Sequence, residues 1–224
     1  MKIDFDAEKH EYSVDGEKIP SVSEILNPLN AERYGLLNAM VLQEAARRGT
    51  AVHEATEQID YELEPDEDPE IEGYVNAYYQ FLFDHDADWL MIEQIVPYYR
   101  CEGEPPIYAG TVDRFGWVDD ELAVVDIKTY ASMSTEAQLT ASCQTALYRD
   151  AIMWGKDSWA DDYTKPIKRY VLHLKKDGKY RLIDLDNFDE KRGWNGPAMA
   201  WELYNFYAAK RDALAGKRKK NGLR

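Results

Sequence analysis

The sequence predicts a single α/β domain built on a mixed central β-sheet flanked by helices. The expected elements follow one another as helices, strands, a helix, strands and a helix, the order of such a layered domain. The chain has 224 residues, enough to bury a sizeable core. Apolar residues make up 45% of it, including six Trp and sixteen Tyr, which excludes global disorder.

The N-terminal residues alternate as the strands of a β-hairpin do. Ile3 and Phe5, and then Tyr12 and Val14, are spaced by two residues, and Asp15-Gly16 is a typical turn pair. We therefore expect a small hairpin at the start of the chain.

Helix signals follow the hairpin. Ser21 and Ser23 are candidate N-caps of a short helix, which Pro28 is expected to limit. A helical pattern resumes at Leu36, and Gly49-Thr50 predicts a break, with Thr50 capping the helix that restarts there.

The rest of the chain divides into further elements with clear boundaries. A loop is expected at 64–69, helices at 71–85, 136–154 and about 197–215, strands at about 89–99, 107–118 and 122–129, and a hairpin of 168–175 with 179–186. The expected domain covers residues 1–216, with residues 1–48 as an N-terminal elaboration and residues 217–224 as a basic tail.

The net charge of −15 is concentrated in one segment of the chain. Residues 49–99 contain fourteen acidic residues and no Lys or Arg, and the other 28 acids nearly balance the 27 basic residues. Most acids of this segment are expected to be solvated at a helix end and a loop. The remainder of the surface is therefore free to present a basic groove to an acidic partner.

Two cysteines, Cys101 and Cys143, exclude a disulfide framework and a four-cysteine zinc or iron–sulfur site. No run of about 18 apolar residues is present, and the N-terminus lacks the pattern of a signal peptide. We expect a reducing, cytoplasmic setting and no membrane partner.

The strand expected at 122–129 carries charge on an otherwise apolar segment. Asp126 and Lys128 are two residues apart and so lie on one face of the strand. Burying such charges costs several kcal/mol each unless they pair or bind an ion. The alternative is an ordinary Asp–Lys pair on an exposed strand face.

The preceding strand brings a second carboxylate to this position. If Asp119-Asp120 is a two-residue turn, Val118 pairs with Glu121, and Asp113 lies across from Asp126 with Cβ atoms about 4.5–5.5 Å apart. A register shifted by one residue would place Asp113 on the other face. Two carboxylates this close repel unless a cation lies between them or one is protonated, which favours Mg²⁺ or Mn²⁺.

Four ordered motifs resemble those of the PD-(D/E)XK nuclease superfamily, and within it the RecB-like exonuclease branch. They are Gly49-Thr-Ala-Val-His53, Ala109-Gly-Thr-Val-Asp113-Arg114, Asp126-Ile-Lys-Thr129 and Gln144-Thr-Ala-Leu-Tyr148. The segment 19–22, Ile-Pro-Ser-Val, also resembles phage-type members. Some relatives in this branch hold an iron–sulfur cluster on four cysteines, which this chain cannot supply.

The resemblance implies a restriction-endonuclease-like core and a role for each matching residue. The metal ligands that it implies are His53, Asp113, Asp126 and the carbonyl oxygen of Ile127, with Glu93 as a further acidic ligand. The catalytic residues that it implies are Lys128, Asp113 and Asp126, with Gln144 and Tyr148 supporting the site or contacting the DNA backbone.

Several of these residues have an ordinary structural alternative. His53 and Glu57 share a helix face and are also compatible with a solvated surface. Gln144 and Tyr148 lie about 100–140° from the centre of the apolar stripe of their helix, so core packing is not their evident role.

The expected function is that of a Mg²⁺- or Mn²⁺-dependent deoxyribonuclease, acting as an exonuclease in recombination, repair or phage DNA processing. The alternatives are a catalytically weak module that binds DNA ends, an endonuclease on the same fold, and a metal enzyme that is not a nuclease. DNA is the expected partner, in a bacterium or a phage-infected cell, together with a helicase, a single-strand-binding protein or a recombination protein. Arg47, Arg48 and Arg114 are expected to recruit phosphate.

Overall fold

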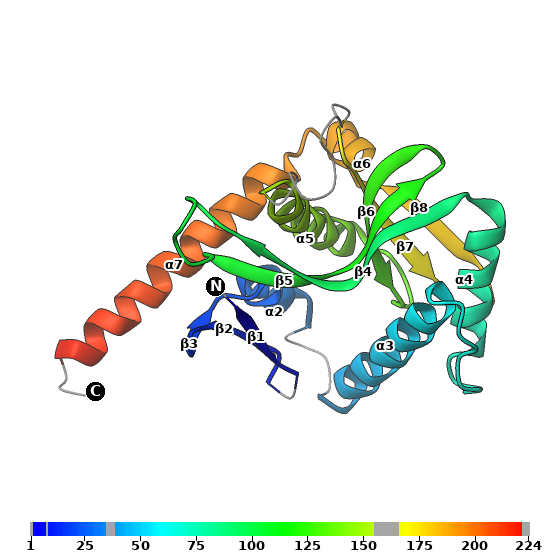
Figure 1. Ribbon diagram of the computed structural model, residues 1–224, viewed down its shortest axis with the longest axis horizontal. Helices are drawn as coiled ribbons and strands as arrows, with labels where there is room; N and C mark the ends of the chain where they lie inside the picture. The colour runs from blue at the N-terminus through cyan, green and yellow to red at the C-terminus, as the bar shows by residue number, and fades with distance from the viewer. Residues whose placement is uncertain (1, 8, 35–38, 155–165, 221–224) are drawn as a thin grey trace.

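The computed structural model describes residues 2–7, 9–34, 39–154 and 166–220 (Figure 1). The strands are β1 Ile3–Asp6, β2 Glu11–Val14, β3 Glu17–Ile19, β4 Ala87–Tyr98, β5 Tyr108–Val118, β6 Glu121–Lys128, β7 Lys168–Leu174 and β8 Tyr180–Asp184. The helices are α1 Val22–Ile25, α2 Asn27–Tyr34, α3 Ala39–Asp60, α4 Glu72–Asp84, α5 Thr135–Trp154, α6 Leu185–Arg192 and α7 Gly196–Lys220.

A five-stranded sheet in the order β4-β5-β6-β7-β8 forms the centre of the fold. Strands β6 and β7 are parallel, and every other neighbouring pair in this sheet is antiparallel. The predicted α/β class with a mixed central sheet is therefore confirmed. Within the described residues, no helix has both the length and the apolar character needed to cross a membrane.

Helices cover both faces of this sheet (Figure 1). Helices α1, α5 and α7 pack on one face, in a core that includes Leu122 and Val124 of β6. Helix α3 and helix α4 pack on the other face, against Ala123, Val125 and Ile127. Because β6 is buried on both faces, its sequence is nearly continuously apolar.

The N-terminal strands form a separate small sheet in the order β1-β2-β3. Asp15 and Gly16 both have positive φ, at 51° and 81°, as a type I′ turn requires, so the predicted hairpin is confirmed. This sheet is attached to β5, since the Ala109 N–H donates to the Pro20 carbonyl at 3.0 Å. The expected N-terminal elaboration thus lies against the strand that carries Asp113.

Ser21 caps α1, as predicted, and Ser23 lies inside that helix. The Ser21 hydroxyl accepts from the Glu24 N–H at 3.0 Å, and the Glu24 side chain accepts from the Ser21 N–H. Helix α1 ends at Ile25, before Pro28, and Pro28 itself lies in the first turn of the next helix, α2. Proline is tolerated there since first-turn N–H groups have no partner within the helix.

The break expected at Gly49-Thr50 is wrong, because α3 continues from Ala39 to Asp60. The expected start of this helix at Leu36 lies outside the described residues. Glycine lowers the stability of a helix interior by about 1 kcal/mol relative to alanine. Directly after it, Val52, Ala55 and Thr56 are buried against the sheet, and this packing offsets the cost of the glycine.

The C-terminal part of the fold also differs from the prediction. The second strand of the 168–186 hairpin ends at Asp184, whose carboxylate caps α6 by accepting from the Asn187 N–H at 2.8 Å. Helix α6 was not predicted because it is short and mostly polar, and only Leu185, Phe188 and Asp189 are buried. Helix α7 continues to Lys220, so the expected boundary between domain and tail falls inside a helix.

Substitutions at two glycines test the continuity of α3 and the close approach of β4 to β5. Replacing Gly49→Ala should raise the free energy of unfolding by about 0.5–1 kcal/mol, because an added Cβ finds only Thr129 Oγ1 at 3.9 Å. Replacing Gly116→Ala should lower it by about 1–3 kcal/mol, because the Cβ would lie 2.1 Å from the Asp88 carbonyl oxygen. Urea unfolding measures both changes. A Gly49→Ala protein as destabilised as Gly116→Ala would contradict the continuous helix.

Candidate metal centre

The hairpin of β5 and β6 has the register that the sequence predicts. Val118 pairs with Glu121, and the pairing continues to Arg114 opposite Val125. The turn residues Asp119 and Asp120 both have positive φ, at 49° and 66°. The paired residues end at Arg114 and Val125, one position before Asp113 and Asp126. The charge of Asp113 is close enough to raise the pKa of Asp126, so the two carboxylates lie near each other, as expected.

Asp113 and Asp126 are both buried, with 6% and 1% of their surface exposed. One carboxylate oxygen of Asp113, Oδ2, accepts from the Ile127 N–H at 2.6 Å, which ties β5 to the end of β6. Burial raises the pKa of Asp126 to about 6, and the nearby Asp113 adds to this shift although Lys128 opposes it. The pair is therefore electrostatically unfavourable without a compensating positive charge.

Lys128 supplies part of this compensation. Its Nζ lies 2.7 Å from both carboxylate oxygens of Asp126 and donates a hydrogen bond to Oδ1. Burial opposes the charged form of Lys128, but the Asp126 carboxylate outweighs it and raises the pKa of the lysine. The ion pair exists, yet it is not exposed, so the alternative of an ordinary surface pair is wrong.

A second group of possible ligands lies beside this pair. Ligand atoms of His53, Glu93 and Asp113 all lie within 4.8 Å of one another, and this group can hold a metal ion. His53 Nδ1 is 3.0 Å from Glu93 Oε1 and 3.9 Å from Asp113 Oδ1, and His53 Nε2 is 3.3 Å from the Ile127 carbonyl oxygen. Asp126, also an expected ligand, is bound to Lys128 and is not part of this group.

The electrostatic field of the group favours a cation. Burial lowers the pKa of His53, but the carboxylates of Asp113 and Glu93 outweigh burial and raise it to about 8. Asp126 Oδ2 is buried and, among the described residues, its contact is the ion pair with Lys128 Nζ at 2.7 Å. Carboxylate and carbonyl oxygens with one imidazole fit a hard divalent ion such as Mg²⁺ or Mn²⁺.

Glu93 reaches this group through an unusual backbone conformation. Its φ is +45°, a left-handed value that costs a non-glycine residue about 1 kcal/mol or more. The side chain accepts from Arg114 Nη1 at 3.1 Å and contacts His53. Strain of this kind persists where the surrounding structure fixes it, and here it places the carboxylate in the site.

Arg114 does not recruit phosphate as expected, because its side chain is fully buried. Its Nε donates to Asp60 Oδ2 at 2.5 Å, and its Nη2 donates to Thr56 Oγ1 at 3.1 Å. The Nη1 group donates to Glu93 and, at 2.6 Å, to the Asp113 carbonyl. Arg114 therefore positions α3, β4 and β5 around the site.

The other two arginines differ from each other. Arg47 is paired with Glu70 and Glu44 at the surface, and its side chain stays half exposed, so its expected contact with phosphate remains a prediction. Arg48 lies over the Tyr74 ring at 5.9 Å, and its buried Nε has no acceptor among the described residues. Arg48 also lines a cavity of about 400 Å³ that borders His53 and Lys128.

Gln144 and Tyr148 both line the cleft, as the resemblance implies. Tyr148 is also 4% exposed and packs in the core, so the expectation that it has no packing role is wrong. Gln144 Nε2 donates to the Tyr148 hydroxyl at 3.1 Å, and both side chains line the same cleft as Lys128. Tyr148 is also packed against Gly110, where a Cβ atom would lie 2.5 Å from its ring. The glycine thus leaves the space that this tyrosine occupies.

The site opens into a cleft of about 670 Å³. Glu54 and Glu57 of α3 line one wall, and Phe5, His10 and Tyr12 of the N-terminal sheet line another. Sequence reasoning missed this second wall, because alternation predicts a hairpin but not the surface on which it packs. The Tyr12 hydroxyl is bonded to Thr111 Oγ1 at 2.8 Å, which holds the wall against β5.

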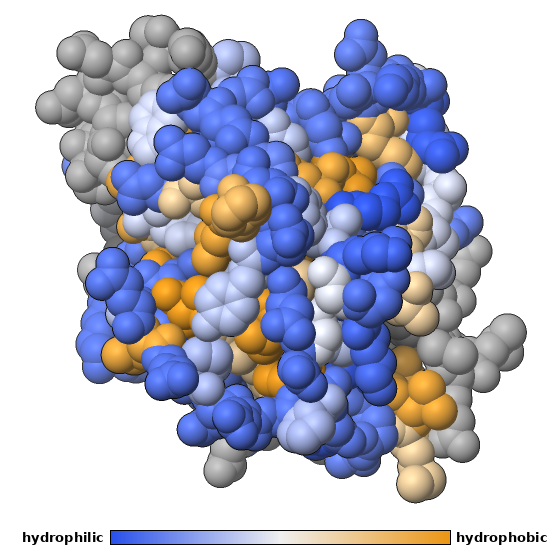
Figure 2. Space-filling model, turned by 90° about the vertical axis from the view of Figure 1, so that its right-hand side faces the viewer, coloured by the Kyte–Doolittle hydropathy of each residue, from blue (hydrophilic) through white to orange (hydrophobic). Residues whose placement is uncertain are grey.

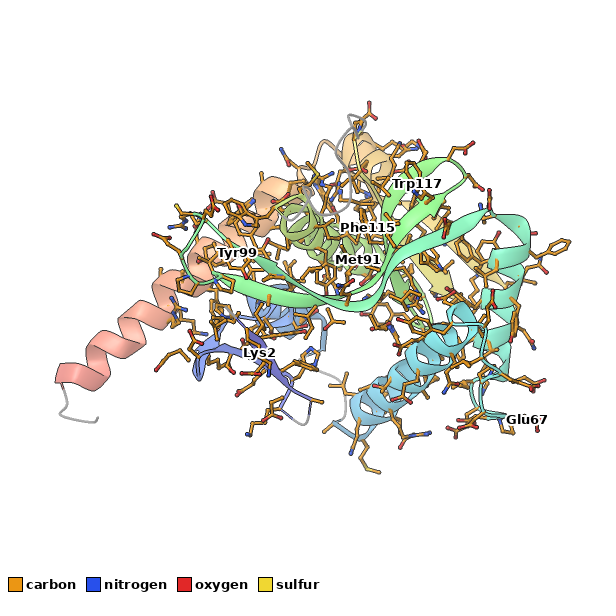
Figure 3. The ribbon with its side chains drawn as sticks, in the orientation of Figure 1. Lys2, Glu67, Met91, Tyr99, Phe115 and Trp117 are labelled. Atoms are coloured by element: carbon orange, nitrogen blue, oxygen red, sulfur yellow. The ribbon has the colours of Figure 1, made fainter. Side chains whose placement is uncertain are left out.

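The acidic loop between α3 and α4 lies apart from the cleft. Residues 64–69 line a different surface depression, together with residues of α4. Glu67 lies at the outer edge of the molecule, far from Met91 and Phe115 in the sheet (Figure 3). Seen from the α4 side, hydrophilic residues surround several apolar patches (Figure 2). This loop does not enter the site.

Comparison of the chain with protein-family models and with curated proteins found no match. The candidate site has three parts: the His53, Glu93 and Asp113 group, the buried pair of Asp126 and Lys128, and the cleft into which the site opens.

Removing a ligand should weaken metal binding. We expect His53→Ala and Glu93→Gln each to raise the Kd for Mn²⁺ by roughly tenfold or more, because each removes a donor that the remaining group cannot replace. Titration with Mn²⁺ by electron paramagnetic resonance or calorimetry measures the change. His85→Ala is the matched control. His85 lies away from the site, where its Nδ1 is 2.5 Å from Oδ2 of the exposed Asp119. An equal loss in the control, or an unchanged Kd in both site variants, would contradict the assignment.

Proposed function

We propose that this protein is a metal-dependent deoxyribonuclease with a restriction-endonuclease-like core, of the RecB-like branch of the PD-(D/E)XK superfamily. One observation supports this above the others. Asp113, Asp126 and Lys128 converge at one end of a buried hairpin, beside a histidine and a glutamate that face the same cleft. The convergence follows the order of the motifs that the sequence carries.

Mg²⁺ or Mn²⁺ would be held by His53, Glu93, Asp113 and the carbonyl of Ile127. Such an ion supplies a water of lowered pKa and shields the charge of the scissile phosphate. Asp126, whose carboxylate oxygens are both 2.7 Å from Lys128 Nζ, would hold this lysine beside the ion. These residues supply oxygen ligands and one imidazole, the donor set that suits either ion.

Lys128 would stabilise the negative charge that builds up on the phosphate during hydrolysis. Its ammonium is fixed by Asp126 and lines the cleft, so little reorganisation is needed when charge develops. Gln144 is hydrogen-bonded to Tyr148 and retains its amide oxygen and a second N–H for a substrate or water. The Gln144–Tyr148 pair would therefore orient the DNA backbone beside Lys128.

The rival function is a module that binds DNA ends without cutting them. Maintaining a buried lysine and several buried carboxylates costs several kcal/mol of desolvation. A module that only bound DNA would gain nothing from this arrangement, or from a strained Glu93 that completes it. The cost favours catalysis over binding alone. The same site would serve an exonuclease or an endonuclease. An exonuclease would cut only linear DNA, whereas an endonuclease would also cut circular DNA.

Lys128→Ala should leave Mn²⁺ binding largely intact and lower turnover by about a hundredfold or more, the effect of losing one transition-state charge. Asp126→Ala should lower both. The assay uses end-labelled linear DNA and circular DNA, single- and double-stranded, with Mg²⁺ or Mn²⁺. Lys179→Ala is the control, because this lysine is exposed on the β7–β8 hairpin. Undiminished cutting by both site variants, or by the parent protein in excess EDTA, would refute the mechanism.

The acidic loop should affect how fast DNA arrives and not how fast it is cut. Neutralising Glu62, Glu64, Asp66, Glu67 and Asp68 together should raise the association rate constant, by at most about tenfold at low ionic strength. The gain should largely vanish above roughly 0.1 M salt, where the Debye length is about 10 Å. Stopped-flow binding at two salt concentrations measures it. A lower turnover on saturating DNA would instead place the loop in the catalytic apparatus.

A further inference from the structure

Three aromatic rings of the N-terminal sheet gather at the cleft. The Phe5 ring is stacked on Tyr12, with centroids 4.8 Å apart and planes at 29°, and His10 meets Phe5 edge-on at 5.3 Å. Tyr12 is 1% exposed, whereas Phe5 is 37% exposed, so Phe5 forms the outer layer of the stack. All three residues line the cleft that contains the candidate metal centre.

The stack is held at a fixed position relative to the metal group. The Tyr12 hydroxyl is bonded to Thr111 Oγ1 on β5, and Asp113 follows two residues later on the same strand. Two residues of a strand span about 7 Å. With β1–β3 anchored beside β5 (Figure 1), the rings therefore lie within a few nucleotides of any phosphate bound at Asp113.

The charge of the cleft argues against capture of DNA by its backbone alone. Its lining includes four carboxylates, those of Glu54, Glu57, Glu93 and Asp113, and a single lysine, Lys128. Apart from His53, the described lining of this cleft would attract phosphate at Lys128 and at a metal ion held by the His53, Glu93 and Asp113 group. Stacking of a base on an aromatic ring needs no positive charge and contributes about 1–3 kcal/mol per base.

We propose that Phe5, supported from behind by Tyr12 and flanked by His10, is a stacking platform for one base of single-stranded DNA. A base exposes its face to such a ring only when it is unpaired and unstacked, so the platform selects single strands or frayed ends over intact duplex. This inference rests on the proposed nuclease function, because it assigns the substrate class of that same cleft.

The test is a binding measurement that requires no cleavage. Fluorescence anisotropy in Ca²⁺ compares a labelled single-stranded 12-mer with a blunt duplex that contains the same sequence. Phe5→Ala and Phe5→Leu should each weaken single-strand binding by about fivefold or more and leave duplex binding unchanged, because both remove the ring. Phe5→Trp should retain the affinity. Circular dichroism verifies that each variant is folded, and Phe5→Leu preserves most of the apolar contact with Tyr12.

Phe83→Ala is the matched control, since this phenylalanine is 86% exposed on α4. The inference is overturned if Phe5→Leu binds the single strand as the parent does, if it weakens both DNAs equally, or if the parent binds no single strand. Its failure is distinct from failure of the proposed function. Metal-dependent cutting that does not depend on Phe5 would refute the stacking platform and leave the nuclease proposal standing. Phe5-dependent binding of single strands without any cutting would refute the nuclease proposal alone.

Discussion

The buried guanidinium of Arg114 is the interaction on which the site depends. A guanidinium without exposure must find acceptors inside the protein, and here they come from α3, β4 and β5. Thr56 and Asp60, which accept from Arg114, lie three and seven residues after His53 and so on the same face of α3. The rotation of α3 that satisfies Arg114 is therefore the rotation that directs His53 toward Glu93 and Asp113.

The site gathers more negative charge than its own cations neutralise. Lys128 is paired with Asp126, and Arg114 is shared between Asp60 and Glu93, which leaves Asp113 with the backbone N–H of Ile127 and a histidine of raised pKa. Each buried carboxylate and the strained backbone of Glu93 cost free energy. A bound cation would offset part of this cost, and the His53, Glu93 and Asp113 group could hold one.

Local rules predicted the parts of the structure that short-range geometry determines. A two-residue turn fixes the register of β5 and β6, so the convergence of Asp113 and Asp126 follows from the sequence. Long-range packing determines the rest. Gly49 remains helical because distant strands bury the next turn of α3, and Arg114 is buried because Asp60, 54 residues earlier, accepts from it. No pattern within a short window carries that information.

The acidic segment illustrates the same limit, because its residues act in different places. Asp60 is buried and holds Arg114, Glu93 belongs to the metal group, Glu57 lines the cleft, and Glu67 is in a remote loop. Taken together from the sequence, these charges predict only a solvated acidic surface that repels DNA. Placed in the fold, Glu93 belongs to a group with His53 and Asp113 that could hold a metal ion. The sign of a protein's net charge thus says little about its partner, since the field that selects a ligand is set by the few charges that burial leaves unscreened.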